Sequence, residues 1–172
     1  MPVSAQGTLN GSLLDLRGAA SPSFFMGELM AGYSGTPLPK KLGIKPGHRV
    51  ALVGAPPDFL DVLGDLPEGV RIIAGLRGTR PFDVIIWFVK RRAVLSRRFS
   101  SIAGRLDAVG GLWVAWPKQA SGVATELNGN IVREVLLESG LVDNKICAID
   151  DTWSGLRGVV RVRDRPGWRV GP

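Results

Sequence analysis

The chain has one cysteine and one histidine among its 172 residues. A single cysteine excludes an intrachain disulfide framework and is compatible with a reducing cytoplasm, where we expect the protein to be located. Because structural zinc sites are built from several cysteines and histidines, we expect no metal site. No apolar run reaches the roughly 18 residues that a membrane-spanning helix needs, so we expect no membrane partner.

The glycine-rich loop of nucleotide-binding folds is also missing. Such folds place G-x-G-x-x-G directly after the first strand. Here the strand at residues 49–53 is followed by Gly54, Ala55, Pro56 and Pro57, and prolines lack the backbone N–H groups that cradle a phosphate. Residues 75–81, which follow the second strand, hold no acid to bind ribose hydroxyls. We therefore expect no dinucleotide or adenosyl cofactor.

Positive charge is in excess. The sequence has 22 Lys and Arg against 15 Asp and Glu, a net charge of +7, which indicates an anionic partner such as nucleic acid, nucleotide or phosphate. The densest basic cluster consists of Lys90, Arg91, Arg92, Arg97 and Arg98. Basic residues at the positive start of a helix are unfavourable, so this cluster indicates an anionic partner or nearby acids. A solvated surface is the alternative interpretation.

Residues 82–118 predict the fold class. Residues 83–89 form a nearly unbroken apolar run, typical of a strand buried on both faces. Apolar residues then recur at helical spacing, at Leu95, Phe99, Ile102 and Leu106. A second buried strand follows at 112–116. Two strands joined by a helix make a parallel crossover, the repeating unit of α/β folds.

Further strands are expected at 49–53, 70–74, 145–149 and 156–162. The connection at 150–155 is too short for a crossover helix, so the last two strands must be antiparallel. This order resembles a shortened class I methyltransferase fold, which implies an α/β, Rossmann-like three-layer sandwich. Its mostly parallel six-stranded sheet is expected in the order 2-1-3-4-6-5, ending in an antiparallel hairpin. The ligand crevice is then expected at the carboxyl ends of strands 1 and 3.

One domain is expected, at residues 31–163. Residues 1–30 are small and polar without a sustained period, so we interpret them as a disordered leader or as the product of a mis-annotated start. Residues 164–172 are rich in Pro, Gly and Arg and are expected to fray.

Three blocks of sequence carry a narrower resemblance. They are GYSGTPLPKKLGIKPGHRVALVGAPPDF, GGLWVAWPKQASGV and KICAIDDTWSGLR, within residues 32–163. Together they are similar to domain-of-unknown-function family 3052, small bacterial proteins best known from actinobacteria. The resemblance implies a cytoplasmic bacterial protein, and it carries over no catalytic residue. Gly158 departs from the family pattern, where an aromatic residue is expected, so we expect thin packing around that strand.

The candidate ligand-binding residues lie at the ends of predicted strands. They are Gly54, Lys118, Ser121, Asp150, Asp151 and Trp153. A lysine at a strand's carboxyl end can hold a carboxylate or phosphate, or act as a base when desolvated; anchoring a loop is the alternative. Adjacent aspartates on a strand point to opposite faces, so turn formation is favoured over metal binding. Trp153 is expected to stack on a ligand or to cap the core.

Three hypotheses about function remain. The favoured one is a module that is not an enzyme and binds a small anionic ligand or a protein partner, because both nucleotide-binding features are missing. The second is a nucleic-acid-associated regulator that uses residues 90–98 with Arg71, Arg77 and Arg80. The third is a divergent transferase that uses Lys118 with Asp150. The oligomeric state and the identity of the ligand stay open.

Overall fold

A six-stranded sheet forms the centre of the described part of the chain. The computed structural model describes residues 35–169, and the predicted leader, residues 1–30, lies outside them. The strands are β1 (Arg49–Val53), β2 (Arg71–Ala74), β3 (Phe82–Phe88), β4 (Leu106–Pro117), β5 (Leu141–Ala148) and β6 (Trp153–Val160). They lie in the order β2-β1-β3-β4-β6-β5, parallel from β2 to β4 and antiparallel through β6 and β5. The predicted strand order and terminal hairpin are confirmed.

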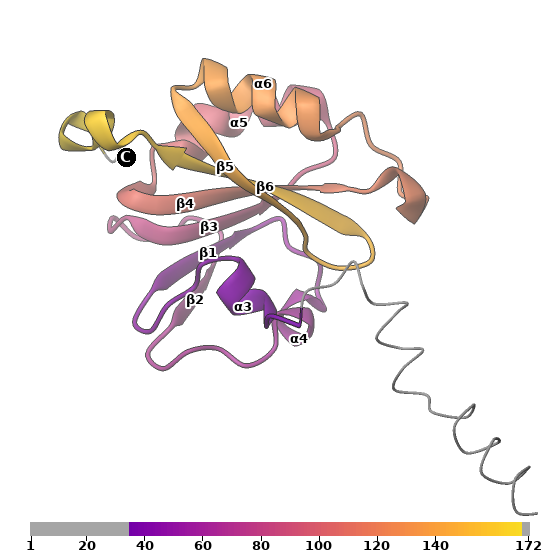
Figure 1. The fold of residues 1–172 in the computed structure, drawn as a ribbon, viewed down its shortest axis with the longest axis horizontal. Coiled ribbons are helices and arrows are strands. Elements are labelled where there is room, and N and C mark those ends of the chain that lie inside the picture. Colours follow the sequence, from indigo (N-terminus) through magenta and orange to yellow (C-terminus); the bar gives the residue numbers. More distant parts are fainter. Residues whose placement is uncertain (1–34, 170–172) are drawn as a thin grey trace, which may run out of the picture. The chain divides into compact units, whose positions relative to one another are not determined.

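Helices cover both faces of this sheet (Figure 1). The short helices α3 (Leu38–Lys41) and α4 (Phe59–Leu63) lie on one face. The longer helices α5 (Arg92–Ala103) and α6 (Gly129–Glu138) lie together on the other. Two 3-10 helices, η1 (Gln119–Ser121) and η2 (Val162–Gly167), complete the described elements. Within residues 35–169, no helix has both the length and the apolarity needed to cross a bilayer.

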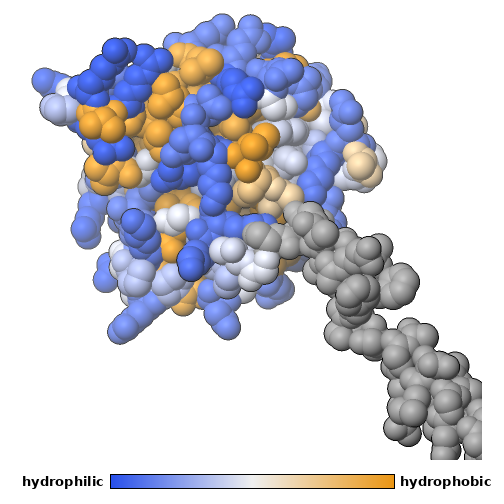
Figure 2. Space-filling view, viewed as in Figure 1, coloured by the Kyte–Doolittle hydropathy of each residue, from blue (hydrophilic) through white to orange (hydrophobic). Residues whose placement is uncertain are grey.

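The alternation of side chains along β3 separates two cores. Val84, Ile86 and Phe88 pack with α3 and α4, whereas Ile85 and Trp87 pack with α5 and α6. Six of the seven β3 residues are buried, which explains why the strand is apolar on both faces. On the side drawn in Figure 2, hydrophilic residues cover most of the surface and hydrophobic residues form separate patches between them.

The fourth strand is longer than the sequence predicts. Leu106, which continues the helical spacing of α5, instead begins β4, because the helix stops at Ala103 and Gly104 caps it. The pairing of β3 with β4 then shifts register between Phe82 and Val84. The predicted frayed tail, residues 164–172, is described up to residue 169. It begins within η2, and the Trp168 indole N–H donates to the Leu106 carbonyl at 2.9 Å.

Gly158 is closely packed, so the expectation of thin packing there is wrong. This glycine lies on β6 opposite Leu112 and faces α6. A Cβ atom added to it would lie 2.5 Å from Cδ1 of Leu136, whose side chain is fully buried. The leucine therefore occupies the space that an aromatic side chain on β6 would need.

Substitution Gly158→Ala should lower the free energy of unfolding by about 1–2 kcal/mol, because Leu136 has to move within a packed core. Chemical denaturation measures this loss. Gly167→Ala is the control, because no atom of the described residues lies within 4 Å of a Cβ there. Equal stabilities for the two variants would contradict the close packing of β6 against α6.

Candidate functional site

A pocket of about 490 Å³ lies at the carboxyl ends of β1 and β3. We call it the carboxyl-edge pocket. Its lining consists of Val53, Gly54, Pro56, Pro57, Trp87, Phe88, Val89, Lys90, Arg91, Val94, Arg98 and Trp153. In the sheet order, β1 is flanked by β2 on one side and β3 on the other, so this is where the direction of chain winding reverses. Ligands of open α/β sheets bind at such a switch point.

Gly54 brings the ends of the two strands close together. Its φ of +65° is in the left-handed region, which residues other than glycine rarely adopt. A Cβ atom at this position would lie 2.9 Å from the carbonyl oxygen of Phe88. The glycine is therefore required by the close approach of β1 to β3, which shapes one wall of the pocket.

Aromatic rings form an apolar base for the carboxyl-edge pocket. The ring of Phe88 packs edge-on against that of Trp153, with centroids 4.9 Å apart, and against that of Phe59, at 4.8 Å. Trp153 is only 7% exposed, so it caps the core and also lines the pocket. Such rings offer a flat, rigid surface for the apolar part of a ligand.

Three cations line the same pocket, and no carboxylate among residues 35–169 does. Lys90 and Arg91 lie between β3 and α5, and Arg98 lies two turns along α5. The Lys90 ammonium is 5.9 Å from the centroid of the Trp153 ring. Lys90 and Arg91 also line a second pocket of about 440 Å³, with Ala124, Thr125 and Glu126. Two adjoining pockets thus share a pair of cations.

The loop before α6 is tied to the start of α5 by hydrogen bonds. The Thr125 hydroxyl and the Glu126 backbone N–H both donate to the Lys90 carbonyl, at 2.9 and 3.1 Å. The Glu126 carboxylate accepts from the backbone N–H of Arg92 at 2.9 Å. These bonds give the second pocket a fixed wall.

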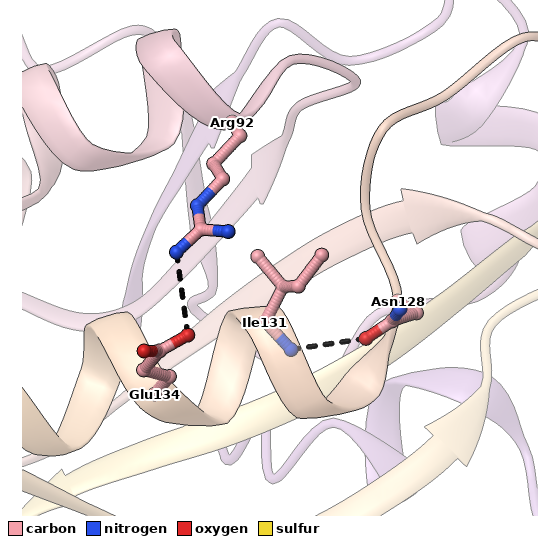
Figure 3. Close-up of polar contacts among 4 residues, drawn as sticks. All are labelled: Arg92, Asn128, Ile131 and Glu134. Atoms are coloured by element: carbon pink, nitrogen blue, oxygen red, sulfur yellow. Dashed lines mark hydrogen bonds and ion pairs between the residues drawn. The ribbon is translucent and has the colours of Figure 1, made fainter.

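Arg92 pairs with α6 rather than with the pocket. Its guanidinium lies 3.4 Å from the Glu134 carboxylate, one turn beyond Ile131, whose N–H is capped by Asn128 (Figure 3). Glu126 and Glu134 are therefore the acidic neighbours that the basic cluster indicated. Arg97 is exposed and does not line the carboxyl-edge pocket.

The structure divides the candidate ligand-binding residues into two groups. Gly54 and Trp153 lie with Lys90, Arg91 and Arg98 in the carboxyl-edge pocket. The remaining four belong to a neighbouring pair of turns and do not line it: Lys118, Ser121, Asp150 and Asp151.

Hydrogen bonds within these turns engage Lys118 and Asp150. The Lys118 ammonium donates to the Asp150 carbonyl at 2.6 Å, and its own carbonyl accepts from the Ser121 hydroxyl at 2.6 Å. The Asp150 carboxylate accepts the backbone N–H groups of Thr152 and Trp153, at 2.8 and 2.7 Å. This carboxylate shapes the turn between β5 and β6.

No metal site is found in the described part of the chain, where no three His, Cys, Asp or Glu side chains come together. Cys147 is half-buried on β5, and burial raises the pKa of its thiol, although Lys41 and Lys145 act in the opposite direction. The thiol is therefore a poor nucleophile near neutral pH.

The sequence pattern does not predict the apolar lining of the carboxyl-edge pocket. Phe88 and Val89 belong to a run typical of a buried strand, and Pro56 and Pro57 lack the N–H groups that bind a phosphate. The available signal was positional: a strand whose last residues lie at the switch point exposes them to its ligand.

Solved structures of methyltransferases share this fold. A SAM-dependent methyltransferase from Aquifex aeolicus is 14% identical, with a TM-score of 0.51 over 71% of this chain and 87% of that one. A precorrin-6y C5,15-methyltransferase from Geobacter metallireducens is 9% identical, with a TM-score of 0.53 over 72% and 86%. A ribosomal protein L11 methylase from Lactobacillus delbrueckii subsp. bulgaricus is 15% identical, with a TM-score of 0.51 over 72% and 75%. At such identities the similarity shows a methyltransferase-like Rossmann architecture.

No family model and no curated protein matches the chain, so the resemblance to family 3052 receives no support. The expectation that the protein is not an enzyme is contradicted, because the three solved structures named above, which share its fold, are methyltransferases. That expectation rested on the missing glycine-rich loop. A missing loop argues against one way of binding a nucleotide, and it leaves catalysis in the pocket open.

Asp150→Ala should lower the free energy of unfolding by about 1–2 kcal/mol, because two backbone N–H groups lose their acceptor. Asp150→Asn, which keeps an acceptor oxygen, should retain most of the stability. Thermal and chemical denaturation of both variants measure the effect. If Asn is as damaging as Ala, the negative charge matters, and the role of the residue is not confined to the turn.

Proposed function

We propose that the protein is a divergent transferase that acts on an anionic substrate in the carboxyl-edge pocket. The observation that carries this proposal is the set of three cations around an apolar base at the switch point of the sheet. The fold, shared with methyltransferases, supports group transfer as the type of reaction. Lys90 and Arg91, which line both pockets, suit a reaction in which donor and acceptor lie side by side.

The cations have two roles in such a transfer. They bind a carboxylate or phosphate of the substrate, and arginine does so with two parallel hydrogen bonds. During transfer, an acceptor atom supplies the electron pair of the new bond to the moving group and releases its proton to solvent, as the bond from that group to its leaving group breaks. The electron pair of the broken bond stays on the leaving group, where Lys90 and Arg91 stabilise the developing negative charge.

S-adenosylmethionine, implied by the fold, does not fit these residues. Ala55, Pro56 and Pro57 replace a glycine-rich loop after β1, and residues 75–81 after β2 hold no carboxylate for a ribose. The three cations of the pocket also repel a positively charged sulfonium. We therefore assign the pocket to an anionic substrate and not to this donor.

We also predict that the protein is cytoplasmic and that it belongs to family 3052. Nucleic acid is the alternative partner. Arg92 is paired with Glu134, and three other members of the basic cluster line a concave pocket, which suits a small anion better than a duplex.

Activity is tested by incubating the full chain with a bacterial metabolite extract and following the compounds by mass spectrometry. The protein should convert an anionic compound, and Arg98→Glu should abolish the conversion because the substrate is then repelled. Arg97→Glu, an equal charge reversal on the same helix outside the pocket lining, should leave it intact.

Binding is tested in parallel by thermal shift with acetyl phosphate, nucleotides, S-adenosylmethionine and short duplex DNA at two salt concentrations. A ligand at a hundred times its Kd stabilises the fold by roughly 2.7 kcal/mol. Arg98→Glu should weaken binding of the anionic ligand at least about tenfold, the effect of losing one charged hydrogen bond. Tight binding of S-adenosylmethionine, or identical behaviour of the two variants, would overturn the assignment.

A further inference from the structure

A third pocket, of about 420 Å³, lies at the opposite edge of the sheet. We call it the amino-edge pocket. Its lining consists of Gly47, Arg49, Gly69, Arg71, Arg80, Pro81, Asp83 and Asp107. Arg49 and Arg71 are the first residues of β1 and β2, and Asp83 is the second residue of β3. The parallel strands run from left to right in Figure 1, so this pocket and the carboxyl-edge pocket lie at opposite ends of them.

Three arginines reach this pocket from separate parts of the chain. Among residues 35–169, no carboxylate lies within ion-pair distance of Arg49, Arg71 or Arg80. Arg71 and Arg80 are also exposed. Their guanidinium groups are therefore available to an anion from outside the chain.

Arg49 is held in place at the side of the pocket. Its guanidinium donates to the Arg77 carbonyl at 2.8 Å and lies 4.7 Å from the centroid of the Phe82 ring. Its Nε is buried and has no hydrogen-bond partner. Because this atom is buried, a ligand does not reach it, and Arg49 contributes its positive charge to the pocket.

A second fixed guanidinium supports the loop that carries Arg80. Arg105 is only 8% exposed and lies 5.7 Å from the centroid of the Phe82 ring. It donates to the carbonyl of Gly78 and, at 3.2 Å, to that of Arg80. Its Nε is likewise buried and without a partner. This buried charge adds to the positive potential beside the pocket.

The two carboxylates of the pocket are engaged by the backbone. Asp83 accepts the N–H of Arg49 at 2.8 Å, and Asp107 accepts the N–H of Val109 at 3.0 Å. A carboxylate has about four acceptor positions, so each retains capacity for further donors. The pocket therefore combines cations for an anionic group with acceptors for hydroxyl or amino groups.

We propose that the amino-edge pocket binds a small phosphorylated molecule. Arg71 and Arg80, with Arg49, hold the phosphate, and Asp83 and Asp107 accept hydrogen bonds from its hydroxyl or amino groups. Arginine matches the geometry of phosphate oxygens with its fork of donors. The volume of the pocket is within the range of small-molecule sites. The two carboxylates beside the arginines disfavour binding of a nucleic acid, because they repel its successive phosphates.

The binding test uses isothermal titration calorimetry of the full chain with glucose 6-phosphate, glycerol 3-phosphate, inorganic phosphate and unphosphorylated glucose. A phosphomonoester should bind, and glucose should not. The double substitution R71A/R80A should weaken binding at least about tenfold, because each arginine supplies a charged hydrogen bond. Both side chains are exposed, so the fold should tolerate the change.

Arg77→Ala is the matched control. Arg77 belongs to the same loop as Arg80, is exposed, contributes only its backbone carbonyl to Arg49 and does not line the pocket. It should leave the affinity within about twofold. The proposal is overturned if no phosphomonoester binds, if R77A weakens binding as much as R71A/R80A, or if binding depends on Arg98 of the carboxyl-edge pocket instead. Binding of duplex DNA alone, lost in R71A/R80A, would replace the small ligand by a nucleic acid.

Discussion

Burial of β3 on both faces determines how the sheet and its two cores are arranged. A strand covered on both sides by helices has room only for apolar side chains between its ends, because each buried charge would need a partner. β1 and β4 take their register from it, and its even and odd residues separate the two cores. Polar chemistry is therefore excluded from the middle of the sheet and placed at its two edges.

The two edges differ in how their cations are held. At the carboxyl ends, Gly54 lets β1 approach Phe88, and the chain then leaves the sheet through Lys90 and Arg91 beside an aromatic base. At the amino ends, the Phe82 ring lies near two guanidinium groups, those of Arg49 and Arg105. An aromatic ring thus lies beside cations at both ends of β3.

Most of the fold was predictable because its signals are local. The apolar run of β3, the short connection before β6 and the order of elements specified the sheet. The start of β4 was not predictable from the sequence, because Leu106 fits the helical period of α5 and only Gly104 marks the end of the helix. The sites were predictable only in part. The pairing of Arg92 with Glu126 and Glu134 joins residues 34 and 42 positions apart, and no local pattern encodes such contacts.

Several acidic side chains bind backbone N–H groups, whereas the arginines of the pockets do not pair with acids among residues 35–169. A net charge of +7 therefore understates how strongly the two pockets attract anions. Asp83, Asp107, Glu126 and Asp150 all accept backbone N–H groups, so their charge stabilises strand ends, a helix start and a turn. The pocket arginines have no such carboxylate partners among residues 35–169. An external anion that reaches either edge therefore meets cations whose charge is not neutralised by an ion pair, and an anionic ligand is the chemistry that both pockets favour.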